Sequence, residues 1–115
     1  MTEFAGDWPE DADGDVFRRL REHSFDFAQP YAVDYNVDFE AWPPSAEAVT
    51  WLEREFGRVC LHPPTVDFGG YAQFQVRGPV TYVGVTSIQR RVSAAMMVHG
   101  GICESWGVMQ PAPTL

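Results

Sequence analysis

The chain has 115 residues, of which 45% are hydrophobic and 14% aromatic, so it can form one domain whose core needs no metal or disulfide for stability. Its formal net charge of -8 disfavours nonspecific binding to nucleic acid phosphates and favours a basic partner instead. No apolar run reaches the roughly 18 residues of a membrane span, and the acidic N-terminus lacks the basic start and apolar run of a signal peptide. We therefore expect a cytoplasmic protein with reduced cysteines.

Residues 1–12 are acidic and contain no basic residue. We expect this segment to be a mobile arm, although Phe4 and Trp8 are side chains that can anchor it. The folded domain is predicted to span residues 13–110, and residues 111–115 form a short tail.

The first helix is predicted at about residues 14–23. Asp13-Gly14-Asp15 offers an N-cap just before it. The acidic residues at its start and the arginines towards its end suit the helix dipole. Its apolar stripe consists of Val16, Phe17 and Leu20.

The next element, at residues 31–40, is predicted to be the central strand of the domain. Its apolar side carries Val33, Tyr35, Val37 and Phe39. Its polar side carries Asp34, Asn36, Asp38 and Glu40. A period of two places these rows on opposite faces of a sheet, one against a helical layer and one open to solvent.

The rest of the chain predicts two more helices and three more strands. Proline cannot donate to a strand ladder, so Trp42-Pro43-Pro44-Ser45 ends the central strand, and Ser45 caps the following helix. The predicted elements are a helix at 46–56, a short edge strand at 58–62 ended by Pro63-Pro64, a strand at 71–77, a helix within 82–98 and a strand at 102–110.

This order is a helix followed by β-α-β-β-α-β. It predicts an α+β fold, a ferredoxin-like two-layer sandwich with an extra N-terminal helix and an antiparallel four-stranded sheet of order 4-1-3-2. The strands at 31–40 and 71–77 are then the inner ones. Cys60 and Cys103 lie on opposite edge strands, too far apart for a disulfide.

The open face of the two inner strands is the predicted partner-binding site. Its residues are Asp34, Asn36, Asp38, Gln73, Gln75 and Arg77. The same row is also consistent with an ordinary solvated surface.

Two acidic patterns resemble metal sites, and both have simpler explanations. Asp11, Asp13 and Asp15 are spaced like the start of a calcium loop, but Val16 occupies the position where such a loop needs glycine. Helix capping and acidic solvation account for them. The row on the central strand spaces its side chains about 7 Å apart, too wide for one compact coordination shell.

No catalytic group, metal or cofactor is predicted. His23, His62 and His99 are scattered, and His99 is expected to face helix C-terminal carbonyls. Cys60 and His62 point to one side of a strand, but no helix N-terminus or basic cluster lowers the thiol pKa there. The glycine pairs match no phosphate-binding motif.

Several stretches carry a family resemblance: Asp13-Gly14-Asp15 before a short helix, the strand VDYNVDFEAW, the Gly70-Tyr71 start of the third strand, and the Gly100–Val108 end. From about Asp13 to Gln110 the sequence resembles the regulator of ribonuclease E activity B (RraB) family of ribonuclease E inhibitors. None of these stretches is a catalytic signature. The resemblance implies a non-enzymatic regulator that binds a ribonuclease E-type endoribonuclease, at a largely disordered region, and restrains RNA cleavage.

Two other functions remain open at this point. An RNA-binding module would use the open sheet, but RRM-type domains stack bases on aromatic residues there, and here only Tyr71 is aromatic. A small-ligand-binding domain would need a pocket between helices and sheet.

Overall fold

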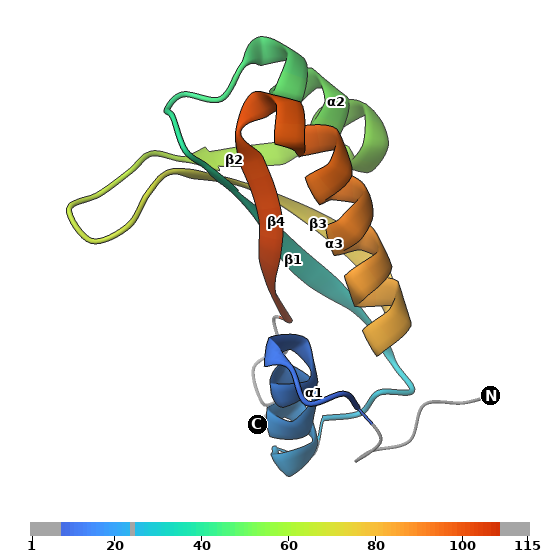
Figure 1. Cartoon of the computed structure of the whole chain (residues 1–115). Coiled ribbons are helices and arrows are strands. Elements are labelled where there is room, and N and C mark those ends of the chain that lie inside the picture. The colour runs from blue at the N-terminus through green and yellow to red at the C-terminus, as the bar shows by residue number, and fades with distance from the viewer. Residues whose placement is uncertain (1–7, 24, 109–115) are drawn as a thin grey trace, which may run out of the picture.

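The structure of the protein is a computed structural model that describes residues 8–23 and 25–108. These residues form three α-helices and one antiparallel sheet of four strands (Figure 1). In chain order the elements are α1 (Ala12–Glu22), β1 (Pro30–Phe39), α2 (Ala46–Phe56), β2 (Val59–His62), β3 (Tyr71–Pro79), α3 (Tyr82–Met96), the 3-10 turn η1 (Met97–His99) and β4 (Gly101–Val108). The predicted α+β class, the antiparallel sheet and the additional N-terminal helix are confirmed.

The strands lie in the order β2-β3-β1-β4, which is 4-1-3-2 when read from the other edge. β1 is central and pairs with β3 from Pro30 to Asp38. Cys60 on β2 and Cys103 on β4 lie on opposite edge strands, and both are free thiols.

The two faces of β1 are as different as the alternation predicts. Val33, Tyr35, Val37 and Phe39 are each at most 7% exposed. They pack in the core with residues of α2, β3 and α3, including Leu52, Phe74, Val92 and Met96. Burying each such side chain stabilises the fold by about 1.5 to 3 kcal/mol. On the other face Asp34 and Asn36 are half-buried and Asp38 is exposed, so the facing of this strand is confirmed.

A cluster of aromatic rings fixes α1 at the far end of the helical layer. Phe17 is fully buried, and its ring lies 5.3 Å from that of Trp8 and 5.2 Å from that of Trp106 on β4. Trp8 is itself only 8% exposed. The part of the predicted arm that the structure describes is therefore anchored through Trp8, whereas residues 1–7, including Phe4, lie outside the described residues.

The start of α1 differs from the prediction. The N-cap is Asp11 and not Asp13, because the Asp11 carboxylate accepts a hydrogen bond from the Gly14 backbone N–H at 2.7 Å. Asp13 lies inside the helix and accepts a hydrogen bond from the Trp106 indole at 2.9 Å. A tertiary contact thus occupies the carboxylate that the sequence suggested as the cap.

Both ends of α2 lie where the sequence predicts them. The Ser45 hydroxyl caps the helix by accepting a hydrogen bond from the Ala48 N–H at 3.1 Å, and the chain leaves at Gly57 with φ of 87°. That positive φ suits glycine, which has no Cβ to clash. Among the described residues, no helix is both long enough and apolar enough to span a membrane.

One irregularity in β4 was not predicted. Asn36 pairs with Ser105, but Val37 pairs with Cys103, so Glu104 has no partner on β1 and forms a β-bulge. The bulge lets Cys103 and Trp106 both be buried while Glu104 and Ser105 are exposed.

Candidate functional site

The six predicted site residues share one face of the sheet, opposite the helices. Asp34 lies across from Gln75, Asn36 from Gln73, and Arg77 from Ala32. We call this surface, which also includes Asp38, the open face. Arg77 and Asp38 lie at opposite ends of the paired stretch.

A chain of hydrogen bonds crosses three strands at the centre of the open face. The Gln73 amide donates to the Asn36 side-chain oxygen at 2.9 Å, and the Asn36 amide donates to the Ser105 hydroxyl at 3.1 Å. These bonds fix the orientation of both amides. Ser105 was not predicted as a site residue, because its facing depends on the neighbouring bulge.

The described residues contain two ion pairs, Arg18 with Asp15 and Arg91 with Glu55, and neither involves a residue of the open face. The face therefore presents the carboxylates of Asp34 and Asp38 without an intramolecular salt bridge among the described residues.

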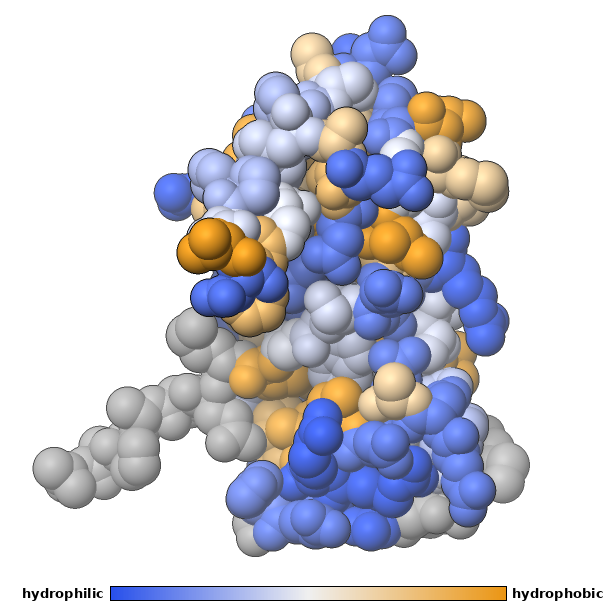
Figure 2. Space-filling view, turned by 60° about the vertical axis from the view of Figure 1, so that its left-hand side comes forward, coloured by the Kyte–Doolittle hydropathy of each residue, from blue (hydrophilic) through white to orange (hydrophobic). Residues whose placement is uncertain are grey.

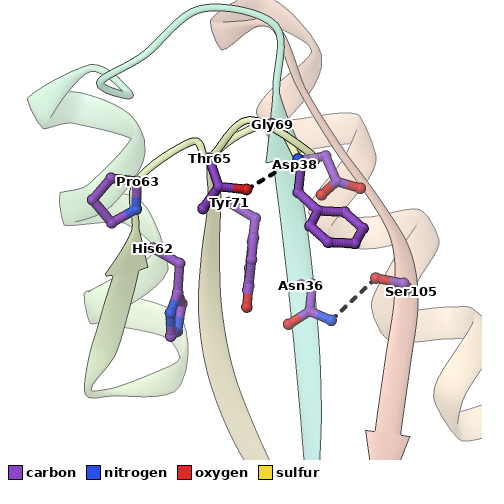
Figure 3. A pocket seen from close by; sticks show the side chains of 9 residues that line it. Asn36, Asp38, His62, Pro63, Thr65, Gly69, Tyr71 and Ser105 are labelled. Atoms are coloured by element: carbon purple, nitrogen blue, oxygen red, sulfur yellow. Dashed lines mark hydrogen bonds between the residues drawn. The ribbon is translucent and has the colours of Figure 1, made fainter.

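The Asp38 end of the open face is hollowed, with a volume of about 500 Å³ (Figure 3). Residues from all four strands line it together with the β2–β3 loop, so we call it the hairpin hollow. Its lining is Asn36, Asp38, His62, Pro63, Thr65, Phe68, Gly69, Tyr71 and Ser105.

The loop that walls the hairpin hollow is held by its own backbone and by a tryptophan. Thr65 exchanges hydrogen bonds with Phe68, its N–H donating to the Phe68 carbonyl at 2.8 Å and its hydroxyl accepting from the Phe68 N–H at 3.1 Å. At the loop end, a Cβ on Gly70 would lie 2.2 Å from the Trp42 ring. Only glycine allows this close approach, which places the loop against the chain that follows β1.

The aromatic side of the hollow is an ordered stack. The His62 and Tyr71 rings lie 4.5 Å apart and within 15° of parallel. His62 Nε2 is enclosed and has no hydrogen-bond partner among the described residues. Phe68 also lines the hollow and is 73% exposed.

The hollow contains one carboxyl group, that of Asp38. Partial burial, and after it the negative charge of Glu104, raises the pKa of the Asp38 carboxyl. No arginine lines the hollow. The positive charge of a cation that entered would favour the ionised form of Asp38 and so oppose this rise in pKa.

A second hollow of about 480 Å³ lies along the same face towards β2 and the end of α2. We call it the edge hollow. Unlike the hairpin hollow, it contains a basic residue, Arg58, together with Asp34.

A third hollow, of about 460 Å³, lies between α1, α3 and β4. It is lined partly by the buried Thr86 and Gln89. This is the position that a small-ligand-binding domain would require. Cys103 also lines it, but burial raises the pKa of that thiol to about 12, so the nucleophilic thiolate is scarce near neutral pH.

The acidic residues at the start of α1 have separate partners. Asp11 accepts a hydrogen bond from the Tyr82 hydroxyl at 2.5 Å, Asp15 pairs with Arg18 at 2.6 Å, and Asp13 binds the Trp106 indole. The hydrogen bond from Tyr82, followed by that from the Gly14 N–H, lowers the pKa of Asp11. Within the described residues, no three His, Cys, Asp or Glu side chains are grouped so as to hold a metal ion.

The histidines have the scattered positions that the sequence indicated. His99 was expected near helix carbonyls, but its Nδ1 instead lies 3.0 Å from the Ser45 hydroxyl. Cys60 and His62 do share the open face, since they pair with Gln73 and Tyr71. The His62 ring is stacked on Tyr71 there.

Figure 2 shows hydrophobic residues as separate patches among hydrophilic ones on the side it displays, with a mostly hydrophilic surface over α1 at the bottom. Large continuous apolar patches are typical of hydrophobic docking surfaces. On the side displayed, the apolar residues instead form separate patches.

Comparison with known families gives a match over most of the chain. The family described as RraB, regulator of ribonuclease activity B, matches residues 10–108. No curated protein and no solved structure matches the chain. The matched range contains all four strands and the whole open face.

Proposed function

Because the chain belongs to the RraB family of regulators of ribonuclease activity, we propose that it is a non-enzymatic protein that docks on a ribonuclease E-type endoribonuclease and restrains RNA cleavage. Its partner would be the nuclease itself, through basic segments of that protein, and not RNA. The observation that carries the docking site is the open face, which presents Asp34 and Asp38 outside any salt bridge among the described residues.

The docking mechanism is charge complementarity. A net charge of -8 attracts a basic segment over long range and repels RNA. Electrostatic complementarity of this kind sets the encounter rate and the specificity more than the final affinity.

Within the site, the six residues have different roles. Asp34 and Asp38 accept hydrogen bonds from cations of the partner. Asn36 and Gln73 are oriented by the hydrogen bonds that cross the sheet, and Gln75 lies beside them. Arg77 marks the far end of the face and disfavours continuation of a basic segment in that direction.

We also propose the domain and the cellular location in which the site lies. We assign residues 13–110 to a single domain of the ferredoxin-like sandwich type, a view supported by the β-α-β-β-α-β order after α1. We propose residues 1–12 and 111–115 as its arm and tail, with the arm anchored to the domain through the buried Trp8. A cytoplasmic location fits the two free thiols.

The test measures cleavage of a fluorescent RNA by a ribonuclease E-type enzyme with and without the protein, and binding of the two proteins. Asp34→Asn/Asp38→Asn removes two charges from the open face. Glu47→Gln/Glu53→Gln removes two from exposed positions on α2, and is the matched control. We expect the first variant to lose binding and inhibition and the second to retain both.

Measuring binding at several salt concentrations is an independent test. Binding should weaken by roughly tenfold or more as salt rises from about 50 to about 300 mM, because exposed charges are screened. Unchanged cleavage at saturating protein, or a direct shift of single-stranded RNA by the protein, contradicts the proposed function.

A further inference from the structure

The hairpin hollow differs from the rest of the open face in combining a carboxylate with aromatic walls. Asp38 contributes the charge, and Tyr71 and Phe68 contribute ring faces. Its volume of about 500 Å³ lies within the range of sites that enclose small molecules or protruding side chains.

The Tyr71 ring of the aromatic wall is held in place before any ligand arrives. His62 stacks against Tyr71 at 4.5 Å, which restricts the Tyr71 ring from one side. Phe68 projects from a loop that Thr65 closes by two hydrogen bonds. A fixed ring costs little conformational entropy when a planar group stacks on it.

The polar groups of the hairpin hollow favour a ligand that donates hydrogen bonds. Asp38 is an acceptor, and no arginine lines the hollow to neutralise it. The edge hollow has a different composition, since Arg58 lines it together with Asp34. Arg58 therefore makes the edge hollow less favourable for a cationic ligand than the hairpin hollow.

From this combination we propose that the hairpin hollow binds an arginine side chain of the partner, an inference that rests on the proposed docking function. The guanidinium stacks on the aromatic wall and donates to Asp38. A guanidinium is planar, weakly hydrated and able to stack and to donate in a fork, whereas a lysine ammonium is a strongly hydrated point charge. The hollow thus confers a preference for arginine over lysine that a merely acidic surface lacks.

The experiment titrates the protein with a short glycine-serine peptide that carries spaced arginines, and with counterparts in which lysine or citrulline replaces every arginine. Amide chemical shifts report the site. We expect the arginine peptide to bind roughly fivefold or more tightly than the lysine peptide. The citrulline peptide, which keeps the shape without the charge, should not bind. Shifts should centre on Phe68, Gly69 and Tyr71.

Three variants separate the hollow from the general charge of the face. Asp38→Asn and Phe68→Ala should each abolish the preference for arginine over lysine. Asp34→Asn removes the same charge from the same strand, but outside the hairpin hollow, and should keep that preference. Asp38 and Phe68 are exposed side chains, so thermal melting should show that all three variants remain folded.

The outcomes distinguish the two proposals. Equal binding of arginine and lysine peptides, with equal loss in the Asp34 and Asp38 variants, overturns the arginine pocket and leaves the proposed docking function standing. Shifts of Tyr71 produced by a single-stranded RNA oligonucleotide, and not displaced by the arginine peptide, identify a base-stacking site and overturn both. Arginine-selective peptide binding without any effect on the nuclease retains the pocket and overturns the nuclease as the partner.

Discussion

The indole N–H of Trp106 on β4 donates a hydrogen bond of 2.9 Å to the carboxylate of Asp13 on α1. These residues are far apart in the chain, and this bond joins the N-terminal helix to an edge strand. Trp106 is 8% exposed, so most of its side chain is shielded from water.

Asp13→Ala is therefore expected to destabilise the domain by about 1.5 to 3 kcal/mol, the usual contribution of a hydrogen bond to a charged group. Asp15→Ala is the matched control in the same first turn, since Asp15 makes an exposed pair with Arg18 of the kind that contributes roughly 0 to 1 kcal/mol. Urea denaturation measures both. Equal losses would show that the indole hydrogen bond adds nothing.

A second prediction compares neighbouring residues on opposite faces of β1. Val37 is fully buried, and Val37→Asp places an unpaired charge in the core, so the free energy of unfolding should fall by several kcal/mol. Asp38→Ala should leave the domain folded and weaken partner binding. Denaturation and a binding assay on both variants test this, and similar instability in the two would contradict the assignment of the docking face.

A third prediction concerns alkaline pH. Burial, together with the nearby negative charges of Asp38 and Asp13, raises the pKa of the Cys103 thiol to about 12. Burial likewise raises the pKa of Tyr35. Because the unfolded chain loses these protons at lower pH than the folded chain, stability is fully present below about pH 8.5 and falls as pH rises towards 12.

The measurement is urea denaturation at successive pH values from about 8 to about 11. Cys103→Ala should start from a lower stability, since it leaves space in the core, but its stability should fall less steeply with pH. An unchanged slope in this variant would show that Cys103 does not contribute to the alkaline decline.

The fourth prediction addresses the wall of the hairpin hollow. At Gly70 a Cβ would meet the Trp42 ring at 2.2 Å, whereas at Gly69 it would meet nothing within 4 Å. Gly70→Ala should cost about 1 to 3 kcal/mol through overpacking and shift the amide signals of the loop. Gly69→Ala, the adjacent control, should do neither. The close approach of Trp42 is refuted if the two variants melt alike.

Some parts of the fold could be predicted from the sequence because the signals are local. The alternation from Val33 to Glu40 fixes both faces of β1, and Ser45 with Gly57 marks the ends of α2. The start of α1 was misplaced because Asp11 and Asp13 both suit an N-cap, and the choice depends on Trp106, a residue distant in sequence. Trp8 was recognised only as one of two candidate anchors, since nothing local indicates the ring on which it packs.

The candidate site, like the fold, could be predicted from the sequence only in part. The six residues of the open face follow from strand alternation and strand order. The hairpin hollow does not, because it depends on how the β2–β3 loop lies over the sheet. Phe68 lies in that loop and was not among the predicted site residues, and Ser105 reaches Asn36 only through the register that the Glu104 bulge sets.

The Glu104 bulge also affects how other molecules can approach the sheet. It interrupts the ladder in β4, one of the two edge strands, and the other edge is the short β2, which Pro63-Pro64 follows directly. Bulges, short strands and prolines all discourage the addition of a further strand. The sheet is thus poorly suited to lengthening by β-augmentation or by edge-to-edge self-association.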